Sequence, residues 1–219
     1  MRIELPSGTP AEVAGSSDER GLVLVPDIMG LRPLFDEMAA RLAEEWQCCV
    51  VVPEPYPGEE HLDLEGRFAA ASSLTDERVL GDMAAAADRT GAETATAIGF
   101  CMGGMYVNKA VSTGRFNRLV SFYGMIHVPE GWRGPGQGEP LEHLSNGDPS
   151  SLLAIVGTAD PYTPAEGVAE LRESGVQVVE YSEAEHGFVH DPARPAHRPV
   201  DAADAWQRAS RWLWQFSGL

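Results

Sequence analysis

Basic side chains are scarce in this sequence. Lys and Arg together number 16 against 33 Asp and Glu, which gives a net charge of −17 at pH 7. Such an excess of negative charge opposes non-specific binding to nucleic acid and to anionic membrane surfaces. No apolar run reaches the ~18 residues of a membrane-spanning helix, and residues 1–10 lack the apolar core of a secretory signal. We therefore expect a cytoplasmic protein with a small-molecule partner, no nucleic acid and no membrane; the composition favours no particular oligomeric state.

Cysteine is also scarce, with Cys48, Cys49 and Cys101 as the three examples. An odd number without metal-ligand spacing predicts neither a disulfide framework nor a metal site. Cys48 and Cys49 are adjacent, so their side chains point to opposite faces if they share a strand. We expect free thiols in a reducing compartment, no metal and no cofactor.

The chain has enough apolar residues to bury one substantial core. It is 219 residues long and 43% hydrophobic, and we predict a single domain over residues 1–219. Apolar runs typical of buried strands alternate with segments of helical periodicity. The strands are predicted within residues 21–30, 48–58, 94–100, 118–125, 151–160 and 176–188, each with the loop that follows it. This alternation predicts an α/β fold with a mostly parallel central sheet and helices on both faces.

Capping signals locate the helices between these strands. Pro33 occupies a position that a first helical turn tolerates, and Thr75 is a predicted N-cap. The stretch "TPAE", residues 163–166, predicts a capping box with Pro164 at the first helical position. The apolar stripe of a last helix is predicted from Trp206, Ala209, Leu213 and Phe216. Residues 59–74 are expected to form a loop with helical pieces, and residues 127–150 a long loop.

Ligands bind beyond the carboxyl ends of the strands in such sheets, so the residues just after strands are the candidates for function. The stretch "GFCMGG", residues 99–104, follows a strand and opens a helix. In that context Gly99 and Gly103 would let strand and helix approach closely enough to place Cys101 on a strained turn. A buried packing role for Cys101 is the alternative. A phosphate-binding loop is not favoured, because the stretch has neither a G-K-[ST] ending nor G-x-G-x-x-G spacing.

A nucleophile needs a base within reach, and the base needs a third group to orient it. His186 and Asp160 follow later strands of the same sheet, and the chain order nucleophile, acid, histidine is typical of α/β-hydrolases. The backbone N–H groups of Met102 and of Ile28, in the loop "PDIMG", are the predicted oxyanion donors. Cys101, Asp160 and His186 are thus the predicted catalytic residues.

The sequence resembles the dienelactone hydrolase family, which are single-domain α/β-hydrolases with a Cys-Asp-His triad. The resemblance runs from about Gly21 to the last helix and rests on "LVPDIMG", "GFCMGG", "FYG", "GTADP" and "EHGF", in the family's order. It implies that Tyr123 lines the pocket. Asp27 stands where the family has a glutamate that controls thiol ionisation, and His190 stands where it has an arginine that holds the substrate's carboxylate. Arg67 is a candidate to replace a second family arginine.

These observations predict hydrolysis of a small ester or lactone through a thioester of Cys101. One alternative is a redox- or electrophile-sensing cysteine on a hydrolase-like scaffold, which would need no oriented His–Asp pair. A binding module that holds its ligand without turnover is the other.

Overall fold

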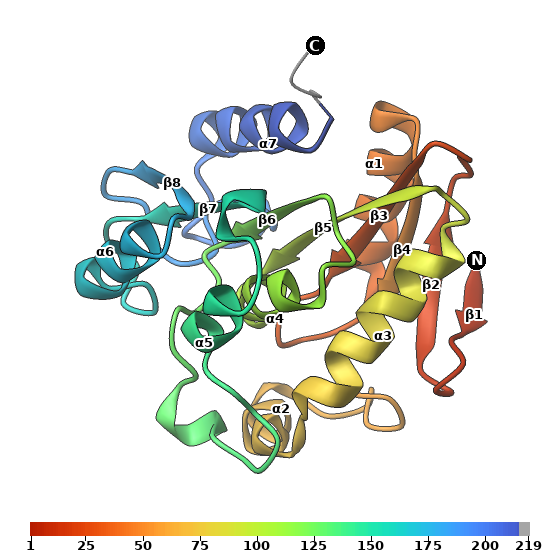
Figure 1. The fold of residues 1–219 in the computed structure, drawn as a ribbon, viewed down its shortest axis with the longest axis horizontal. Coiled ribbons are helices and arrows are strands. Elements are labelled where there is room, and N and C mark those ends of the chain that lie inside the picture. Colours follow the sequence, from red (N-terminus) through yellow and green to blue (C-terminus); the bar gives the residue numbers. More distant parts are fainter. Residues whose placement is uncertain (215–219) are drawn as a thin grey trace.

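The computed structural model describes residues 1–214, which form an eight-stranded sheet with helices packed on it (Figure 1). The strand order is β1-β2-β4-β3-β5-β6-β7-β8. The six strands from β4 to β8 in this order are parallel, and β1 and β2 are antiparallel additions at one edge. The predicted domain extends to residue 219, and Phe216 of the predicted last helix lies outside the described residues.

The strands are β1 (Arg2–Glu4), β2 (Pro10–Ala14), β3 (Arg20–Val25), β4 (Cys49–Pro53), β5 (Thr94–Phe100), β6 (Arg118–Phe122), β7 (Leu152–Gly157) and β8 (Gln177–Tyr181). The helices are α1 (Pro33–Trp46), α2 (Leu64–Ala70), α3 (Asp76–Arg89), α4 (Met102–Ala110), α5 (Pro140–Ser145), α6 (Ala165–Glu173) and α7 (Pro199–Trp214). Short 3₁₀ turns are η1 (Ala71–Ser73), η2 (Val111–Thr113), η3 (Glu130–Trp132) and η4 (Pro149–Ser151).

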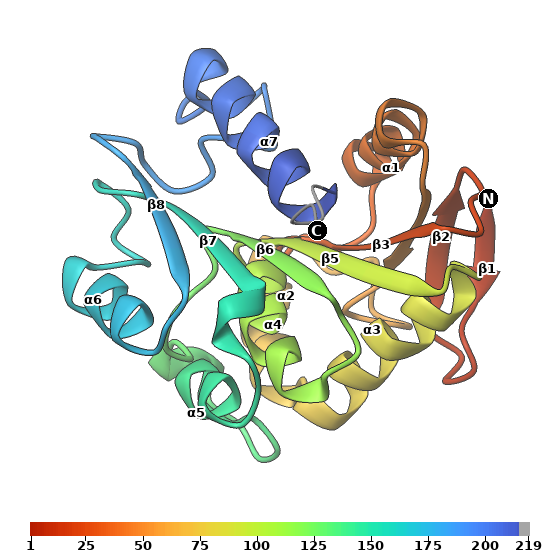
Figure 2. The ribbon, with the colours of Figure 1, turned by 45° about the horizontal axis from the view of Figure 1, so that its top comes forward.

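The helices cover both faces of the sheet, as the alternation of elements predicts. Helices α1 and α7 lie on one face, and α3, α4 and α6 lie on the other (Figure 2). Because side chains alternate along a strand, Leu22 and Leu24 of β3 pack into the first layer, whereas Val23 and Val25 pack into the second. Both faces of the parallel strands are therefore buried.

The adjacent cysteines follow the same alternation. Cys48 packs in the layer with α1 and α7, Cys49 packs in the layer with α3 and α4, and both are free thiols. This confirms the predicted division between the two faces.

Three local predictions need correction. Strands β1 and β2 were not predicted, because they are only three and five residues long and mostly half-exposed, without a buried run. The capping box at residues 163–166 is wrong: α6 has Pro164 as its N-cap, and Thr163 instead donates its N–H to the carbonyl of Asp160. The predicted long loop at 127–150 contains α5, η3 and the start of η4.

No helix within residues 1–214 is long and apolar enough to cross a membrane. The carboxyl ends of β3, β5, β6, β7 and β8 meet at one edge of the sheet because these strands are parallel. The residues that follow them are thereby brought together.

Candidate active site

Cys101 lies on a sharp turn between β5 and α4. Its backbone has φ 56° and ψ −117°, a conformation that costs free energy in a residue with a side chain. Glycines permit the turn: a Cβ on Gly99 would lie 2.2 Å from the Gly103 carbonyl oxygen, and one on Gly103 would lie 2.3 Å from that of Pro26. Cys101 is half-exposed and lines the main pocket, so the alternative of a fully buried packing cysteine is not what the structure has.

His186 and Asp160 form a hydrogen-bonded pair in the loops that follow β8 and β7. The His186 Nδ1 to Asp160 Oδ2 distance is 2.8 Å, and the other carboxylate oxygen accepts the N–H of Tyr162 at 2.8 Å. Asp160 is fully buried at its side chain, so these bonds fix its orientation. Burial alone would lower the pKa of His186, but the hydrogen bonds and charges of Asp160 and Cys101 outweigh it and raise that pKa to about 9.

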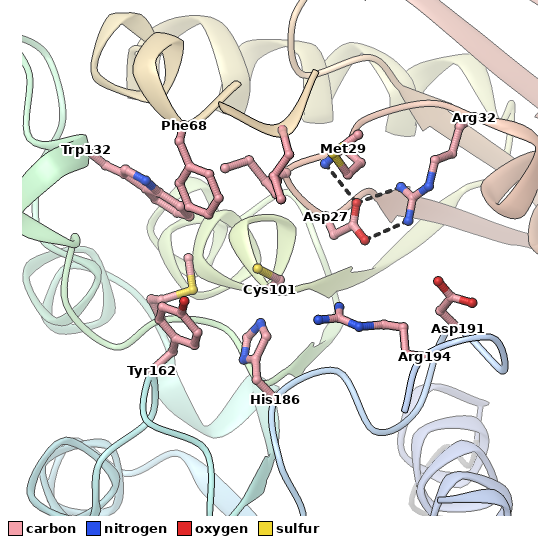
Figure 3. A pocket seen from close by; sticks show the side chains of 13 residues that line it. Asp27, Met29, Arg32, Phe68, Cys101, Trp132, Tyr162, His186, Asp191 and Arg194 are labelled. Atoms are coloured by element: carbon pink, nitrogen blue, oxygen red, sulfur yellow. Dashed lines mark hydrogen bonds and ion pairs between the residues drawn. The ribbon is translucent and has the colours of Figure 1, made fainter. Parts of the chain in front are cut away.

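The remaining ring nitrogen of His186 is directed at Cys101. Nε2 is buried and forms no hydrogen bond among residues 1–214, and the Cys101 sulfur faces the ring (Figure 3). The structure therefore brings together Cys101, His186 and Asp160, three residues that are far apart in the sequence.

A tight turn after β3, residues 27–30, forms the other wall of the site, and we call it the oxyanion turn. The N–H of Gly30 donates to the Asp27 carbonyl at 2.9 Å, and the N–H of Met29 donates to Asp27 Oδ1 at 2.9 Å. Neither bond uses the N–H of Ile28, and within residues 1–214 the N–H groups of Ile28 and Met102 have no acceptor. Both remain available as oxyanion donors.

Asp27 is bound from several sides rather than free for a substrate. Arg32 donates to both carboxylate oxygens, at 2.7 and 2.9 Å, and His190 Nε2 lies 2.9 Å from Oδ2. Burial alone would raise the pKa of Asp27, but the hydrogen bonds from His190 and Arg32 hold it well below its usual range. The carboxylate thus stays charged and paired.

Three of the predicted substrate-binding residues do not reach the pocket surface. Tyr123 and His190 are buried, and His190 Nδ1 lies 2.5 Å from the Tyr123 hydroxyl. Arg67 is buried as well, because its guanidinium pairs with the buried Glu54 at 3.3 Å and donates to backbone carbonyls of residues 60 and 62. Of the four predicted residues, Asp27 alone lines the pocket.

The pocket has a volume of about 420 Å³ and two chemically different sides. On one side of Cys101 lie apolar and aromatic side chains, and on the other lie charged ones (Figure 3). The apolar side includes Phe68, Trp132 and Tyr162, and the charged side is formed by Asp27, Arg32, Asp191 and Arg194. Leu64 and Met125 also line the pocket.

Arg194 is the pocket residue that sequence reasoning missed and that has the clearest chemistry. Its guanidinium packs on Gly187, since a Cβ built there would lie 2.7 Å from Arg194 Nη1. Within the described residues its side chain forms no hydrogen bond and no ion pair within 4.0 Å, in contrast to Arg32. It follows His186 in a loop without periodicity, so no pattern in the sequence indicated it.

Among residues 1–214, no group of three or more His, Cys, Asp or Glu side chains is arranged to hold a metal ion.

A mostly parallel sheet with helices on both faces, a residue on a strained strand-to-helix turn, and a histidine and an acid after later strands define an α/β-hydrolase. Solved structures agree. A protein from Klebsiella pneumoniae subsp. pneumoniae, described as a dienelactone hydrolase, superposes with a TM-score of 0.85 over 99% of this chain and 98% of its own, at 24% identity. A dienelactone hydrolase-like promiscuous phosphotriesterase from metagenomic libraries has a TM-score of 0.72 at 20% identity, covering 97% of this chain and 96% of its own.

The sequence itself matches the dienelactone hydrolase family over residues 8–217. It is 30% identical to the carboxymethylenebutenolidase of Rhodococcus opacus over 209 residues, which are 89% of this chain and 79% of that protein. It is also 27% identical to a Bradyrhizobium sp. protein described as a 2-oxo-3-(5-oxofuran-2-ylidene)propanoate lactonase, in an alignment that covers 90% of this chain and 84% of that one. The chain belongs to the dienelactone hydrolase family, and membership makes it a carboxylic ester hydrolase.

Proposed function

We propose that this protein hydrolyses a small carboxylic ester or lactone through a thioester on Cys101. The observation that carries the proposal is the alignment of three groups. Cys101 stands on a strained turn in the pocket, the ring of His186 faces the Cys101 sulfur, and Asp160 holds the Nδ1 of that ring at 2.8 Å. A packing cysteine would need none of this.

The proposed reaction has two steps. The Cys101 sulfur, having lost its proton to His186, attacks the carbonyl carbon; the C–S bond forms and the carbonyl oxygen becomes an oxyanion. The N–H groups of Ile28 and Met102 donate to that oxygen. The intermediate collapses, the C–O bond breaks and the departing alkoxide takes the proton from His186. Water then attacks the thioester, gives a proton to His186, and releases the acid and the Cys101 thiolate.

Asp160 has a supporting task in both steps. It accepts a hydrogen bond from Nδ1 of His186, which leaves Nε2 as the nitrogen that exchanges protons with sulfur and substrate. It also favours the positive charge that His186 carries while Cys101 is a thiolate.

The two sides of the pocket suggest the substrate's shape. A cavity of about 420 Å³ suits a small molecule. The apolar side would receive a hydrocarbon or ring portion, and Arg194, a cation without a partner among the described residues, would receive an anionic group such as a carboxylate. Arg194 thus takes the task that the sequence assigned to Arg67 and His190.

The proposal is tested by Cys101→Ala, assayed with a small activated ester such as p-nitrophenyl acetate. Loss of a nucleophile of this kind costs about 10⁴-fold or more in rate. The matched control is Cys49→Ala. Cys49 is buried in the layer between the sheet and helices α3 and α4 and does not line the pocket, so this variant should retain full activity. Mass spectrometry of the wild type quenched during turnover should find the acyl group on the peptide that contains Cys101.

Retention of most activity by Cys101→Ala would contradict the proposal. The alternatives of a sensing thiol and of a silent binding module make a different prediction. Cys101 would react with alkylating reagents, but no ester would be turned over and Asp160→Asn would change nothing. The oriented Asp160–His186 pair and the family membership both favour turnover.

A further inference from the structure

A second hydrogen-bonded chain of side chains lies beneath the pocket, behind the oxyanion turn. It runs from the Tyr123 hydroxyl to His190 Nδ1 at 2.5 Å, and from His190 Nε2 to Asp27 Oδ2 at 2.9 Å. All three residues are buried, and the ring of His190 stacks on Phe100 at 4.8 Å between centroids. The mechanism proposed above uses none of these side chains directly.

We propose that His190 is a positioning residue: through Asp27 it fixes the oxyanion turn so that the N–H of Ile28 points at the carbonyl oxygen of the substrate. The inference rests on the proposed hydrolysis and adds to it a residue that contacts neither the substrate nor Cys101.

The pKa shifts of His190 and Tyr123 determine which atoms carry protons in this series of hydrogen bonds. Burial lowers the pKa of His190 despite the charge of Asp27, and burial raises the pKa of Tyr123 well above its usual value. His190 is therefore neutral and Tyr123 keeps its proton. The Tyr123 hydroxyl donates to Nδ1, and Nε2–H donates to the Asp27 carboxylate, so every polar group of the chain is satisfied.

The Asp27 carboxylate connects His190 to the oxyanion turn. Oδ2 is bound by His190 and Arg32, whereas Oδ1 is bound by Arg32 and by the N–H of Met29. Ile28 lies between Asp27 and Met29, so a rotation of the carboxylate would disturb the Met29 bond and tilt the Ile28 peptide. Arg32 and Met29 are close to Asp27 in the sequence, so among the groups that bind the Asp27 carboxylate, His190 is the one that comes from another part of the fold.

The other end of the chain is anchored at the nucleophile. Tyr123 directly follows Phe122, whose carbonyl accepts the N–H of Cys101 at 3.0 Å, and the Tyr123 N–H donates to Ile155 at 2.7 Å. Tyr123 also has a positive φ of 41°. The chain therefore links the half of the oxyanion site next to Cys101 with the half formed by Ile28.

The experiment compares His190→Leu and His190→Gln with wild type in two reactions. Hydrolysis of p-nitrophenyl acetate passes through an oxyanion, whereas alkylation of Cys101 by iodoacetamide displaces iodide at a saturated carbon and forms none. His190→Leu should lower kcat by about 10²-fold, the size of effect expected when an oxyanion donor is lost or misplaced. KM and the alkylation rate should stay within about twofold of wild type, because only transition-state binding is lost. His190→Gln should recover part of kcat, since its amide can still donate to Asp27.

A matched control exists elsewhere in the fold. His143 forms the same kind of chain, with Nε2 3.0 Å from Asp76 Oδ2 and Nδ1 2.8 Å from the Ser112 hydroxyl, outside the pocket. His143→Leu removes an equivalent pair of bonds and should leave kcat unchanged. If His190→Leu does not fold, Tyr123→Phe replaces it, with about a tenfold loss of kcat expected, and Tyr181→Phe is its control because that hydroxyl bonds Asp204 at 2.6 Å.

Three results would overturn the inference. An unchanged kcat with a raised KM would make His190 a substrate-binding residue, as the sequence predicted. A parallel loss of hydrolysis and alkylation would mean that it acts on the thiol. Equal losses in His190→Leu and His143→Leu would show a general effect on folding. Failure of the proposed function is distinct from all three, since it would appear as hydrolysis that survives Cys101→Ala.

Discussion

His186 and His190 lie near the same pocket, and each is hydrogen-bonded to an aspartate. Their pKa values are nevertheless shifted in opposite directions. Burial lowers the pKa of His190 by more than Asp27 raises it, and the charges of Arg194 and Arg32 lower it further, so His190 stays neutral. Asp160 has no cationic partner among the described residues other than His186, and the proton is therefore favoured on His186. Burial and the nearby arginines therefore keep His190 neutral, whereas Asp160 and Cys101 favour the charged form of His186.

The raised pKa of His186 predicts the alkaline limb of the pH–rate profile. The protonated imidazole is needed to protonate the leaving group, so kcat/KM should fall with an apparent pKa near 9. Asp160→Asn removes a group that favours the protonated His186, so the alkaline limb should move to lower pH and the rate should fall.

The shift of the His186 pKa from 6.5 to about 9 also affects stability. It stabilises the fold below pH 6.5, and this contribution is lost as the pH rises through about 9.

Initial rates from about pH 6 to pH 10 with a small ester would measure this limb. Asp204→Asn is a suitable control, because its hydrogen bonds are to Tyr181 and Arg208 away from the pocket. An alkaline limb that stays in place in Asp160→Asn would contradict the assignment of the titration to His186.

Arg194 should distinguish substrates by charge. Arg194→Gln keeps most of the side-chain length and removes the cation, so KM for an ester or lactone that bears a carboxylate should rise by about tenfold or more, the effect of losing a charged hydrogen bond. KM for a neutral ester of similar size should not change. Steady-state kinetics with such a matched pair of substrates would check this. Arg172→Gln is the control, because Arg172 pairs with Glu180 and does not line the pocket. Equal effects on both substrates would count against a carboxylate site.

At the scale of elements, the turn between β5 and α4 depends on glycines that leave no room for a methyl group. A Cβ on Gly103 would lie 2.3 Å from the carbonyl oxygens of both Val25 and Pro26, which are backbone atoms of the neighbouring strand and its loop. Gly103→Ala should therefore lower the free energy of unfolding by about 1–3 kcal/mol or more.

Helix α3 offers the opposite case for comparison. Gly81 is a helical glycine, and a Cβ there would have no atom within 4 Å. Gly81→Ala should raise the free energy of unfolding by about 0.5–1 kcal/mol, because alanine loses less conformational freedom in a helix. Urea unfolding of both variants would measure these opposite changes in the free energy of unfolding. A stabilised Gly103→Ala would show that the turn is less tightly packed than in the structure.

The residues of the candidate site differ in how well their positions could be predicted from the sequence. The proximity of Cys101, Asp160 and His186 was predictable because each belongs to a short motif at the end of a buried strand, and topology alone brings such ends together. The place of Arg67 was not, because its burial depends on Glu54, a buried partner that no periodicity marks. Arg194 was missed for a related reason: its loop has no pattern, and its approach to the pocket depends on how that loop crosses Gly187.

At the scale of the whole molecule, the parallel strands follow from continuous apolar runs, which a strand buried on both faces requires. The antiparallel edge does not, because β2, which lies between β1 and β4, has mostly half-exposed residues and no buried apolar run. The edge strands add nothing to the pocket, so their absence from the sequence-based prediction did not affect the predicted site.

The excess of negative charge has a consequence for the stability of the entire fold. With 33 acidic and 16 basic residues, the folded chain holds like charges close together, and this repulsion lowers the free energy of unfolding. Raising NaCl from about 0.01 M to about 0.5 M shortens the screening length from roughly 30 Å to below 10 Å. Exposed ion pairs also weaken, but each is worth about 0–1 kcal/mol at most, so the melting temperature should rise.

The size and origin of this effect can be checked with two acidic residues at helix C-termini. Two exposed carboxylates lie at helix C-termini: Glu44 in the last turn of α1, and Glu173, the last residue of α6. The helix dipole disfavours negative charge at these positions. Glu44→Gln with Glu173→Gln should raise the melting temperature at low salt by roughly 2–4 °C for about 1 kcal/mol gained. It should also reduce the further rise on adding NaCl. A melting temperature that falls with salt in the wild type would mean that ion pairs, not net repulsion, dominate the electrostatics of this fold.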